Sequence, residues 1–244
     1  MASARLEIAY VGTGFAGWSA QPGERTVQAE VEAAIERIVG ERVALTVAGR
    51  TDAGVHATGQ VASFEHARGL PDRLVERLNA VLPRDVAITA AGAAPDGFNA
   101  RFDAKARTYR YRVLVSPARD PLEEGRALWW RYPLERELLA TCATSVVGTH
   151  DFTAFTPTQT EHVLFERTVD ECGWEEERPG LLAMQIKAPS FMRNQVRVLV
   201  GTMLEVAAGR RSLDDVRTLL DGAPRERAGE TAPPHGLYLI GVDY

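Results

Sequence analysis

The chain has 244 residues and a mass of 26.7 kDa, and its 45% hydrophobic and 25% charged residues are typical of a globular protein with one large or two ordinary domains. Its formal net charge of −5 and pI of about 5.6 exclude a protein that is basic over its whole surface. Nucleic-acid binding is not excluded, because the local charge of one face or cleft decides it.

The sequence contains no clear membrane, secretion or metal-binding signal. No apolar run approaches the length that spans a bilayer, and the N-terminus lacks the apolar core of a signal peptide. We therefore expect a cytoplasmic protein without a membrane partner. Cys142 and Cys172 lie in separate expected elements and the five histidines are scattered, so we expect no disulfide and no protein-bound metal.

The first half of the chain alternates between strand and helix patterns. Thr26 is an expected N-cap, the apolar residues after it form one stripe, and Gly40 ends the helix. A flexible glycine loop, 12–18, is expected before it, and this order β-α-β-β-α-β is the ferredoxin-like arrangement. The other expected elements are a helix from Pro71 to Pro83 and strands from Arg5 to Val11, Arg42 to Val47, Val61 to Glu65 and Val86 to Ala91.

The second half repeats this order loosely. We predict an α+β protein of two ferredoxin/RRM-like halves with largely antiparallel sheets, 1–102 and 103–244, with the boundary near Ala100 to Ala104. The expected strands are Ala106 to Val115, Val163 to Glu175, Leu181 to Lys187 and Gly236 to Val242, and the expected helices are Leu134 to Val147, Phe191 to Ala208 and Ser212 to Leu219.

One polar, glycine-rich stretch, Ala48 to Gln60, carries a single carboxylate at the end of an expected strand. Gly49 and Gly54 flank Asp52 and allow a ligand to approach the main chain closely. Arg50 is near enough in sequence to keep the carboxylate ionised. An Asp beside Gly is also a common turn former or helix N-cap, so the loop alone leaves both interpretations open.

Charged residues are segregated along the sequence. Arginine, lysine and aromatic residues interleave between Phe98 and Tyr111, a pattern that suits phosphates and stacked bases but also an ordinary sheet strand. From these two groups we expect one basic and one acidic surface. The basic group is Arg101, Lys105, Arg107, Arg110 and Arg112, and the acidic group is Glu161, Glu166, Asp170, Glu171, Glu175, Glu176 and Glu177.

Two further segments carry candidate site residues. Arg193 and Arg197 are expected one turn apart on one helix face, where Arg197 either extends its stem along the apolar edge or points at Asp52 or a phosphate. His150 to Phe155 is a compact polar and aromatic turn, for which a capped loop with packed phenylalanines is the simpler interpretation.

Taken together and in order, these segments resemble the TruA family of tRNA pseudouridine synthases over essentially the whole chain. Gly-Arg-Thr-Asp-Ala-Gly-Val-His-Ala is similar to the catalytic signature of that family. The other matching segments are Ala100 to Tyr111, Gly148 to Phe155, Phe191 to Gly201 and Pro234 to Leu239. Thr156 to Phe165 departs from the family, because it carries Glu161 where relatives often have a basic stretch; local RNA contacts there are in doubt.

The resemblance implies the pseudouridine synthase fold and a cofactor-free isomerase, acting as a homodimer on uridines 38–40 of the tRNA anticodon stem-loop. By the same resemblance Asp52 is the catalytic aspartate, Tyr109 lies against the target base, and Arg197 pairs with the aspartate. Arg50 and Leu237 match further substrate-binding positions. Arg101, Lys105, Arg107 and Arg110 are the candidate RNA contacts of the basic strand.

The chemistry is compatible with a single carboxylate. Isomerisation breaks the N1–C1′ bond, turns the uracil and rejoins it through C5, without redox change or net hydrolysis, so one nucleophile or base suffices. Whether Asp52 attacks C1′, attacks C6 or assists glycal formation is open. The rivals are an RRM-like binding module, for which the RNP string is missing, and a phosphate-handling enzyme, for which Gly-x-x-x-x-Gly-Lys-Ser/Thr is missing.

Overall fold

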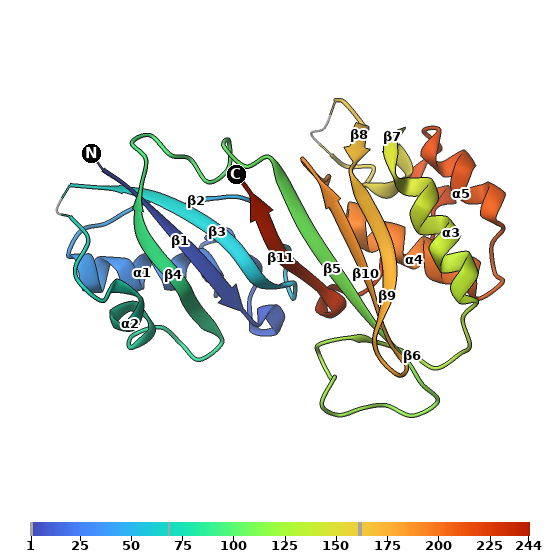
Figure 1. Ribbon diagram of the computed structural model, residues 1–244, viewed down its shortest axis with the longest axis horizontal. Helices are drawn as coiled ribbons and strands as arrows, with labels where there is room; N and C mark the ends of the chain where they lie inside the picture. Colours follow the sequence, from blue (N-terminus) through green and yellow to red (C-terminus); the bar gives the residue numbers. More distant parts are fainter. Residues whose placement is uncertain (1, 68, 161–162) are drawn as a thin grey trace. The chain divides into compact units, whose positions relative to one another are not determined.

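The computed structural model describes residues 2–67, 69–160 and 163–244 (Figure 1). The chain forms two compact units: unit 1 is Met1–Arg107 with Tyr238–Tyr244, and unit 2 is Thr108–Leu237. Glu161, which the sequence singled out, lies outside the described residues. None of the helices in the described part is long and apolar enough to cross a membrane.

Unit 1 is built on a sheet with the strand order β4-β1-β3-β11. β1 pairs antiparallel with both β3 and β4, the short β2 also joins β3 antiparallel, and β11 joins β3 in parallel. The bounds are Ala2–Tyr10 for β1, Thr46–Val47 for β2, His56–His66 for β3, Val86–Ala94 for β4 and Leu237–Asp243 for β11.

Two helices, α1 (Val27–Val39) and α2 (Leu74–Asn79), cover one face of this sheet (Figure 1). α1 begins as predicted, because the Thr26 side chain accepts a hydrogen bond from the Ala29 N–H, and it ends at Gly40 with φ 79°. The covered face is the core of the unit: Leu6, Ile8, Val31, Ile35 and Leu78 are all fully buried.

Two predictions for unit 1 were wrong in extent or character. The expected strand Arg42 to Val47 is regular only over Thr46–Val47, while β3 starts already at His56. The expected flexible loop 12–18 contains a 3-10 turn, Gly12–Gly14, and its aromatic residues Phe15 and Trp18 are buried. Burying two aromatic side chains fixes a loop that its glycines alone would leave mobile.

Unit 2 contains the strands β5, β10 and β9, hydrogen-bonded in that order, with β6 parallel to β5, and a separate antiparallel pair, β7 and β8. The mixed α/β class with mostly antiparallel strands is thereby confirmed. The bounds are Ala106–Val115 for β5, Leu128–Trp130 for β6, Gly148–Asp151 for β7, Glu166–Val169 for β8, Glu171–Arg178 for β9 and Leu181–Ala188 for β10.

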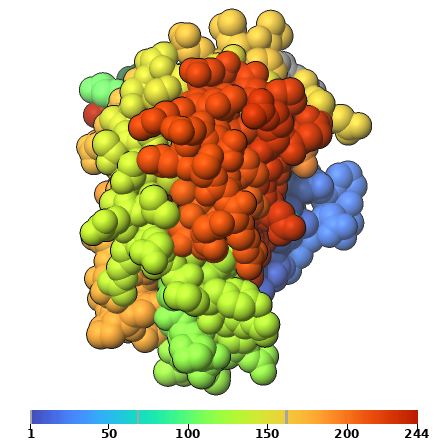
Figure 2. Space-filling model, turned by 90° about the vertical axis from the view of Figure 1, so that its right-hand side faces the viewer, coloured from blue at the N-terminus to red at the C-terminus, as the bar shows by residue number. Residues whose placement is uncertain are grey.

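The helices of unit 2 are α3 (Arg136–Val146), α4 (Gln195–Ala207) and α5 (Leu213–Leu220). Ten of the 13 residues of α4 are buried, and α3 packs against this helix. Figure 2 shows the outer face of this unit, where α5 and the segment after it (orange-red) lie beside α3 (yellow-green). Short 3-10 turns complete the unit at Thr153–Phe155, Arg225–Arg227 and Pro234–Gly236.

The helix expected from Phe191 to Ala208 starts only at Gln195. Asn194 adopts a left-handed conformation with φ 61°, which ends the preceding segment before the helix can begin. Arg193 therefore lies outside the helix, and the predicted shared helix face with Arg197 was wrong. Similarly, the expected strand Val163 to Glu175 is two strands, because β8 pairs with β7 while β9 pairs with β10.

The predicted separation of a basic from an acidic surface was wrong for part of the basic strand. Arg110 on β5 forms ion pairs with Glu175 and Glu177 of β9, at 3.0 and 3.1 Å. Arg112 pairs with Glu177 at 2.9 Å and with Glu123 at 2.7 Å. Only β10 lies between β5 and β9, so the arginine side chains of β5 reach the glutamates of β9 across it on one face of the sheet.

The close contact between β3 and β11 gives a first prediction. A Cβ on Gly59 would lie 2.3 Å from the Ile240 carbonyl oxygen of β11, whereas a Cβ on Gly92 of β4 meets no atom within 4 Å. Gly59→Ala should therefore lower the free energy of unfolding by about 1–3 kcal/mol through overpacking. Gly92→Ala should be neutral or slightly stabilising in urea unfolding, and equal effects of the two changes would contradict the close packing.

Candidate active site

Asp52 lies in the loop 48–55, which connects β2 to β3 in unit 1. Thr51 and Val55 are buried, at 6% and 2% exposure, while Asp52 and Ala53 between them are exposed. Gly54 has φ 78°, a conformation that favours glycine. The loop thus presents one carboxylate from between two buried anchors.

A buried hydrogen-bond chain supports the loop from below. The Tyr10 hydroxyl lies 2.8 Å from the Thr51 hydroxyl, and the Gln60 amide donates to the Tyr10 oxygen at 3.3 Å and to the Gly49 carbonyl at 2.7 Å. Burial raises the pKa of Tyr10 to about 12, so its hydroxyl stays protonated at neutral pH. Because Gln60 donates to the phenol oxygen, the phenol hydrogen is available to Thr51.

The glycine loop 12–18 packs directly against the Asp52 loop. A Cβ on Gly12 would lie 1.9 Å from the Val55 carbonyl oxygen, and one on Gly17, with φ 110°, would lie 2.9 Å from the Thr51 carbonyl oxygen. The Trp18 N–H donates to that same Thr51 oxygen at 3.0 Å. Side chains at these glycines would push the two loops apart, so the glycines serve close packing rather than flexibility.

His56, the first residue of β3, connects the glycine loop to the C-terminal strand. Its Nδ1 accepts a hydrogen bond from the Gly12 N–H at 3.0 Å, so this nitrogen carries no proton. Its ring stacks on Tyr238 of β11 with 4.6 Å between ring centroids and 20° between planes. The histidine of the signature string is therefore held from two sides within unit 1.

Among the four cationic candidates of the basic strand, two are bound to protein groups. Arg107 donates to the Ala48 carbonyl through Nε at 3.0 Å and Nη2 at 2.7 Å, and thereby ties down the start of the Asp52 loop. Arg110 forms the ion pairs described above. Arg101 and Lys105 are exposed, as is Arg50.

The remaining expected site residues belong to unit 2. Tyr109 is 8% exposed, and its ring meets Phe191 edge-on with 5.2 Å between centroids. Arg197 on α4 donates from Nε to the Ala232 carbonyl at 2.7 Å and from Nη1 to the Asn194 side-chain oxygen at 3.1 Å. Leu237 is buried at the start of β11. The expected residues are thus distributed over both units.

The segment before β11 is held close to Arg197. The Ala232 N–H donates to the Arg197 carbonyl at 3.1 Å, and the Tyr111 hydroxyl donates to the Pro233 carbonyl at 2.8 Å. Burial, opposed by Glu124 and aided by Arg197, lowers the pKa of His235, so this side chain is neutral at pH 7.

A cavity of about 510 Å³ in unit 1 does not include the Asp52 loop. It is lined by His66, Pro71 and Leu74 among others, at the Ala2 end of β1. The Asp52 loop contacts the opposite end of the same strand through Tyr10. The candidate site therefore rests on an anchored loop rather than on this cavity.

The sequence did not identify the residues that support the loop. Tyr10 is 41 residues from its partner Thr51, and Gln60 is 50 residues from its partner Tyr10. Strand patterns do not reveal pairs so far apart in sequence. The sequence did contain a signal for the contact between the two loops. Both loops are rich in glycine, and glycine is the residue that lets two backbones approach closely, as Gly12 does here.

The chain is similar in sequence to one family of known proteins. A family described as tRNA pseudouridine synthase matches residues 7–103 and 142–244. A protein of Halalkalibacterium halodurans named tRNA pseudouridine synthase A is 42% identical over 234 residues, covering 95% of this chain and 89% of its own. One of the same name from Bacillus subtilis is 41% identical over 243 residues, covering 98% of both chains.

Similarity to a solved structure is much weaker. A chain of a Cbf5-Nop10-Gar1 complex is 11% identical, with a TM-score of 0.34 over 83% of this chain. The match spans only 54% of that longer chain.

The support beneath Asp52 gives a second prediction. The Tyr10 pKa is about 12 in the folded state and about 10 when unfolded, so its stabilising contribution is complete below pH 10 and is lost as pH rises toward 12. Between pH 10 and 12 the unfolding free energy of the wild type should fall as pH rises. In Tyr10→Phe this slope should be less steep, by up to about 1.4 kcal/mol per pH unit. Urea unfolding between pH 9 and about 11.5 measures it. Parallel curves for the two proteins would show that Tyr10 is not buried.

Proposed function

Because the chain belongs to the tRNA pseudouridine synthase family and is thus an isomerase of tRNA uridines, we propose that it modifies uridines 38–40 of the anticodon stem-loop, with Asp52 as the essential group. The observation that carries the proposal is the exposed Asp52 carboxylate on a loop that buried contacts anchor on both sides. The mixed α/β architecture with mostly antiparallel strands fits the pseudouridine synthase fold.

The reaction needs an accessible carboxylate in a fixed position. The N1–C1′ bond breaks, the detached uracil turns, and C5 bonds to C1′. The C5 hydrogen leaves as a proton and N1 takes up a proton, so atoms and charge balance without a co-reactant. Asp52 acts as nucleophile or base in this sequence. Its anchors Thr51 and Val55 hold the loop in place, which removes the entropy that ordering the group at each turnover would cost.

We propose that Tyr109 and Arg197 complete the site. The target uridine must leave its stack at a cost of a few kcal/mol, and contact with the Tyr109 ring offsets part of it. Phe191 meets that ring edge-on and restricts its orientation. Arg197, whose guanidinium is fixed by Ala232 and Asn194, pairs with the Asp52 carboxylate and orients it.

The other candidate residues have supporting roles in this proposal. Leu237 packs against the bound base, and Arg50 meets the RNA near Asp52. Arg101 and Lys105, which are exposed, contact the phosphate backbone. Arg107 and Arg110 act through the protein, because their guanidinium groups bind the Ala48 carbonyl and the β9 carboxylates.

We further propose that two ferredoxin-like halves, 1–102 and 103–244, carry the Asp52 loop and the Tyr109 and Arg197 pair, respectively. Unit 1 supports this with its element order β1-α1-β2-β3-α2-β4. An acidic chain with one modest basic span needs a homodimer to hold a tRNA, in the cytoplasm where tRNA is modified. A monomeric mass at micromolar concentration would count against the dimer.

Substitution of the carboxylate is the direct test of the proposed reaction. Asp52→Asn is isosteric but cannot act as nucleophile or base, so it should reduce tritium release from C5-labelled uridine in an unmodified tRNA transcript by at least about 10³-fold. Affinity for the tRNA, measured by filter binding, should remain within about threefold, since one neutralised charge changes binding little.

Asp96→Asn is the matched control. Asp96 is also exposed and also lies in a loop of unit 1, so this change removes the same charge without touching the Asp52 loop. It should leave tritium release unchanged. Appreciable release by Asp52→Asn, or equal losses in the two variants, would refute the role of Asp52.

A further inference from the structure

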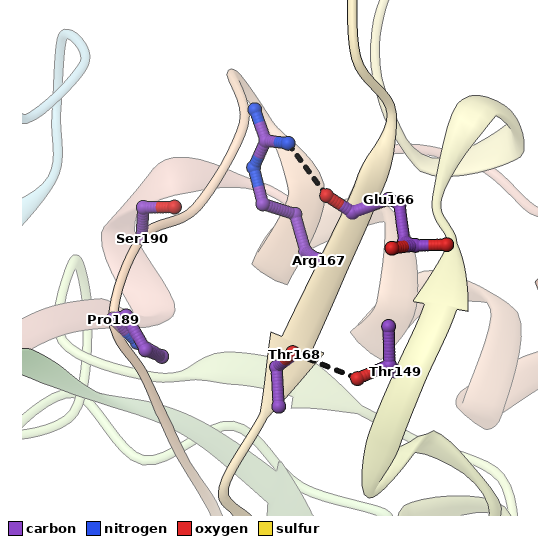
Figure 3. A pocket seen from close by; sticks show the side chains of 6 residues that line it. All are labelled: Thr149, Glu166, Arg167, Thr168, Pro189 and Ser190. Carbon is purple, nitrogen blue, oxygen red and sulfur yellow. Dashed lines mark hydrogen bonds between the residues drawn. The ribbon is translucent and has the colours of Figure 1, made fainter.

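Unit 2 contains a polar cavity of about 260 Å³ that is separate from the residues assigned above (Figure 3). It is formed between the β7–β8 pair and the segment that precedes α4. Its lining residues are Thr149, Glu166, Arg167, Thr168, Pro189 and Ser190.

Arg167 is the cation of this cavity, and its guanidinium is held in place by the main chain. Nη1 donates to the Leu164 carbonyl at 2.9 Å and to the Glu166 carbonyl at 2.7 Å. Its Nε is buried and has no acceptor within hydrogen-bond distance in the described part of the chain. Nε lies on the guanidinium edge that, with Nη2, forms paired hydrogen bonds to a phosphate.

Hydroxyl groups line the other walls. Ser190 faces the Arg167 side chain across the cavity (Figure 3). The Thr149 and Thr168 hydroxyls lie 2.8 Å apart, so one donates to the other and the pair keeps one hydrogen to donate. The Glu166 carboxylate extends on the opposite side of β8 from Arg167 (Figure 3), because successive strand residues alternate in direction. A fixed arginine with hydroxyl donors suits an anion.

The cavity adjoins the residues that contact Tyr109. Ser190 directly precedes Phe191, whose ring meets the Tyr109 ring edge-on at 5.2 Å, and all of these residues belong to unit 2. An RNA whose uridine lies against Tyr109 therefore brings its neighbouring backbone toward Ser190. The anions that a tRNA offers at this place are its phosphates.

We propose that this cavity binds a backbone phosphate of the tRNA next to the target uridine, with Arg167 and Ser190 as its ligands. The inference rests on the proposed function, since it takes tRNA as the substrate. Arg167 positions the strand and does not take part in the reaction, so the contact strengthens binding without changing the chemical step.

The test compares Arg167→Gln with Arg217→Gln. Arg217 is an exposed arginine on α5 of the same unit, so its loss changes the net charge equally. Kd for the anticodon stem-loop RNA is measured against salt in the Asp52→Asn background, and KM and kcat for tritium release in the wild-type background. Melting temperatures of all variants confirm that they fold.

Arg167→Gln should raise Kd and KM by about three- to tenfold and reduce the slope of log Kd against log salt by about 0.7–0.9, as loss of one phosphate contact does. kcat should stay within about twofold, because the contact is made equally in the ground and transition states. Arg217→Gln should leave the slope unchanged. Ser190→Ala, which removes one exposed hydroxyl, should raise KM by about two- to threefold and serves if Arg167→Gln does not fold.

Three outcomes would overturn the proposal. The first is equal salt slopes for Arg167→Gln and Arg217→Gln. The second is an effect of Arg167→Gln on full-length tRNA but not on the stem-loop, which would place the contact away from the target uridine. The third is that inorganic phosphate stabilises the wild type but not Arg167→Gln, while the two proteins bind RNA equally well. That result would make the cavity a site for free phosphate. If Arg167→Gln reduces the slope of log Kd against log salt but the wild type releases no tritium, the proposed function is refuted and the cavity is still supported as an RNA site.

Discussion

The hydrogen-bond chain from the Gln60 amide through the Tyr10 phenol to the Thr51 hydroxyl is the constraint on which the Asp52 loop depends. A loop outside the sheet lacks the backbone hydrogen bonds that pair strands, and such loops are among the segments that unfold locally most easily. Here three buried polar groups can satisfy one another only if the loop stays closed, because each would otherwise be desolvated without a partner. The buried hydrogen bonds therefore fix the position of the loop that carries the exposed carboxylate.

Local signals decided which elements could be predicted from the sequence. α1 was predicted from its Thr26 cap, its apolar stripe and Gly40, all of which act within a few residues. The strand from Arg42 failed beyond Thr46–Val47, because alternation indicates a strand only where a partner strand is available, and β2 meets β3 only over two residue pairs. Arg193 was placed on a helix because the prediction gave no weight to Asn194, although asparagine is one of the few residues that readily adopt the left-handed conformation.

The candidate site divides in the same way. Asp52 was found from its own string of neighbours, whereas the residues that fix it are distant in sequence and ordinary in type. The charge pattern misled for a related reason: Arg110 and Arg112 look like a basic surface in sequence, but strand order brings Glu177 of β9 to both. Charge segregated along a chain becomes charge segregated in space only if the topology keeps the segments apart. Tyr109 and Arg197 took their roles from the family resemblance, and their anchors, Phe191 and Ala232, emerged only with the fold.

The last strand of the chain, β11, belongs to the sheet of the first unit. It pairs in parallel with β3, which follows the Asp52 loop directly, and Tyr238 stacks on His56. During synthesis, about 130 residues of unit 2 are made between these partners. Unit 1 therefore cannot complete its sheet until the residues of unit 2 and β11 have been made. A chain that ended before β11 would contain the candidate residues from Arg50 to Arg197 and still lack the strand that completes the sheet of unit 1.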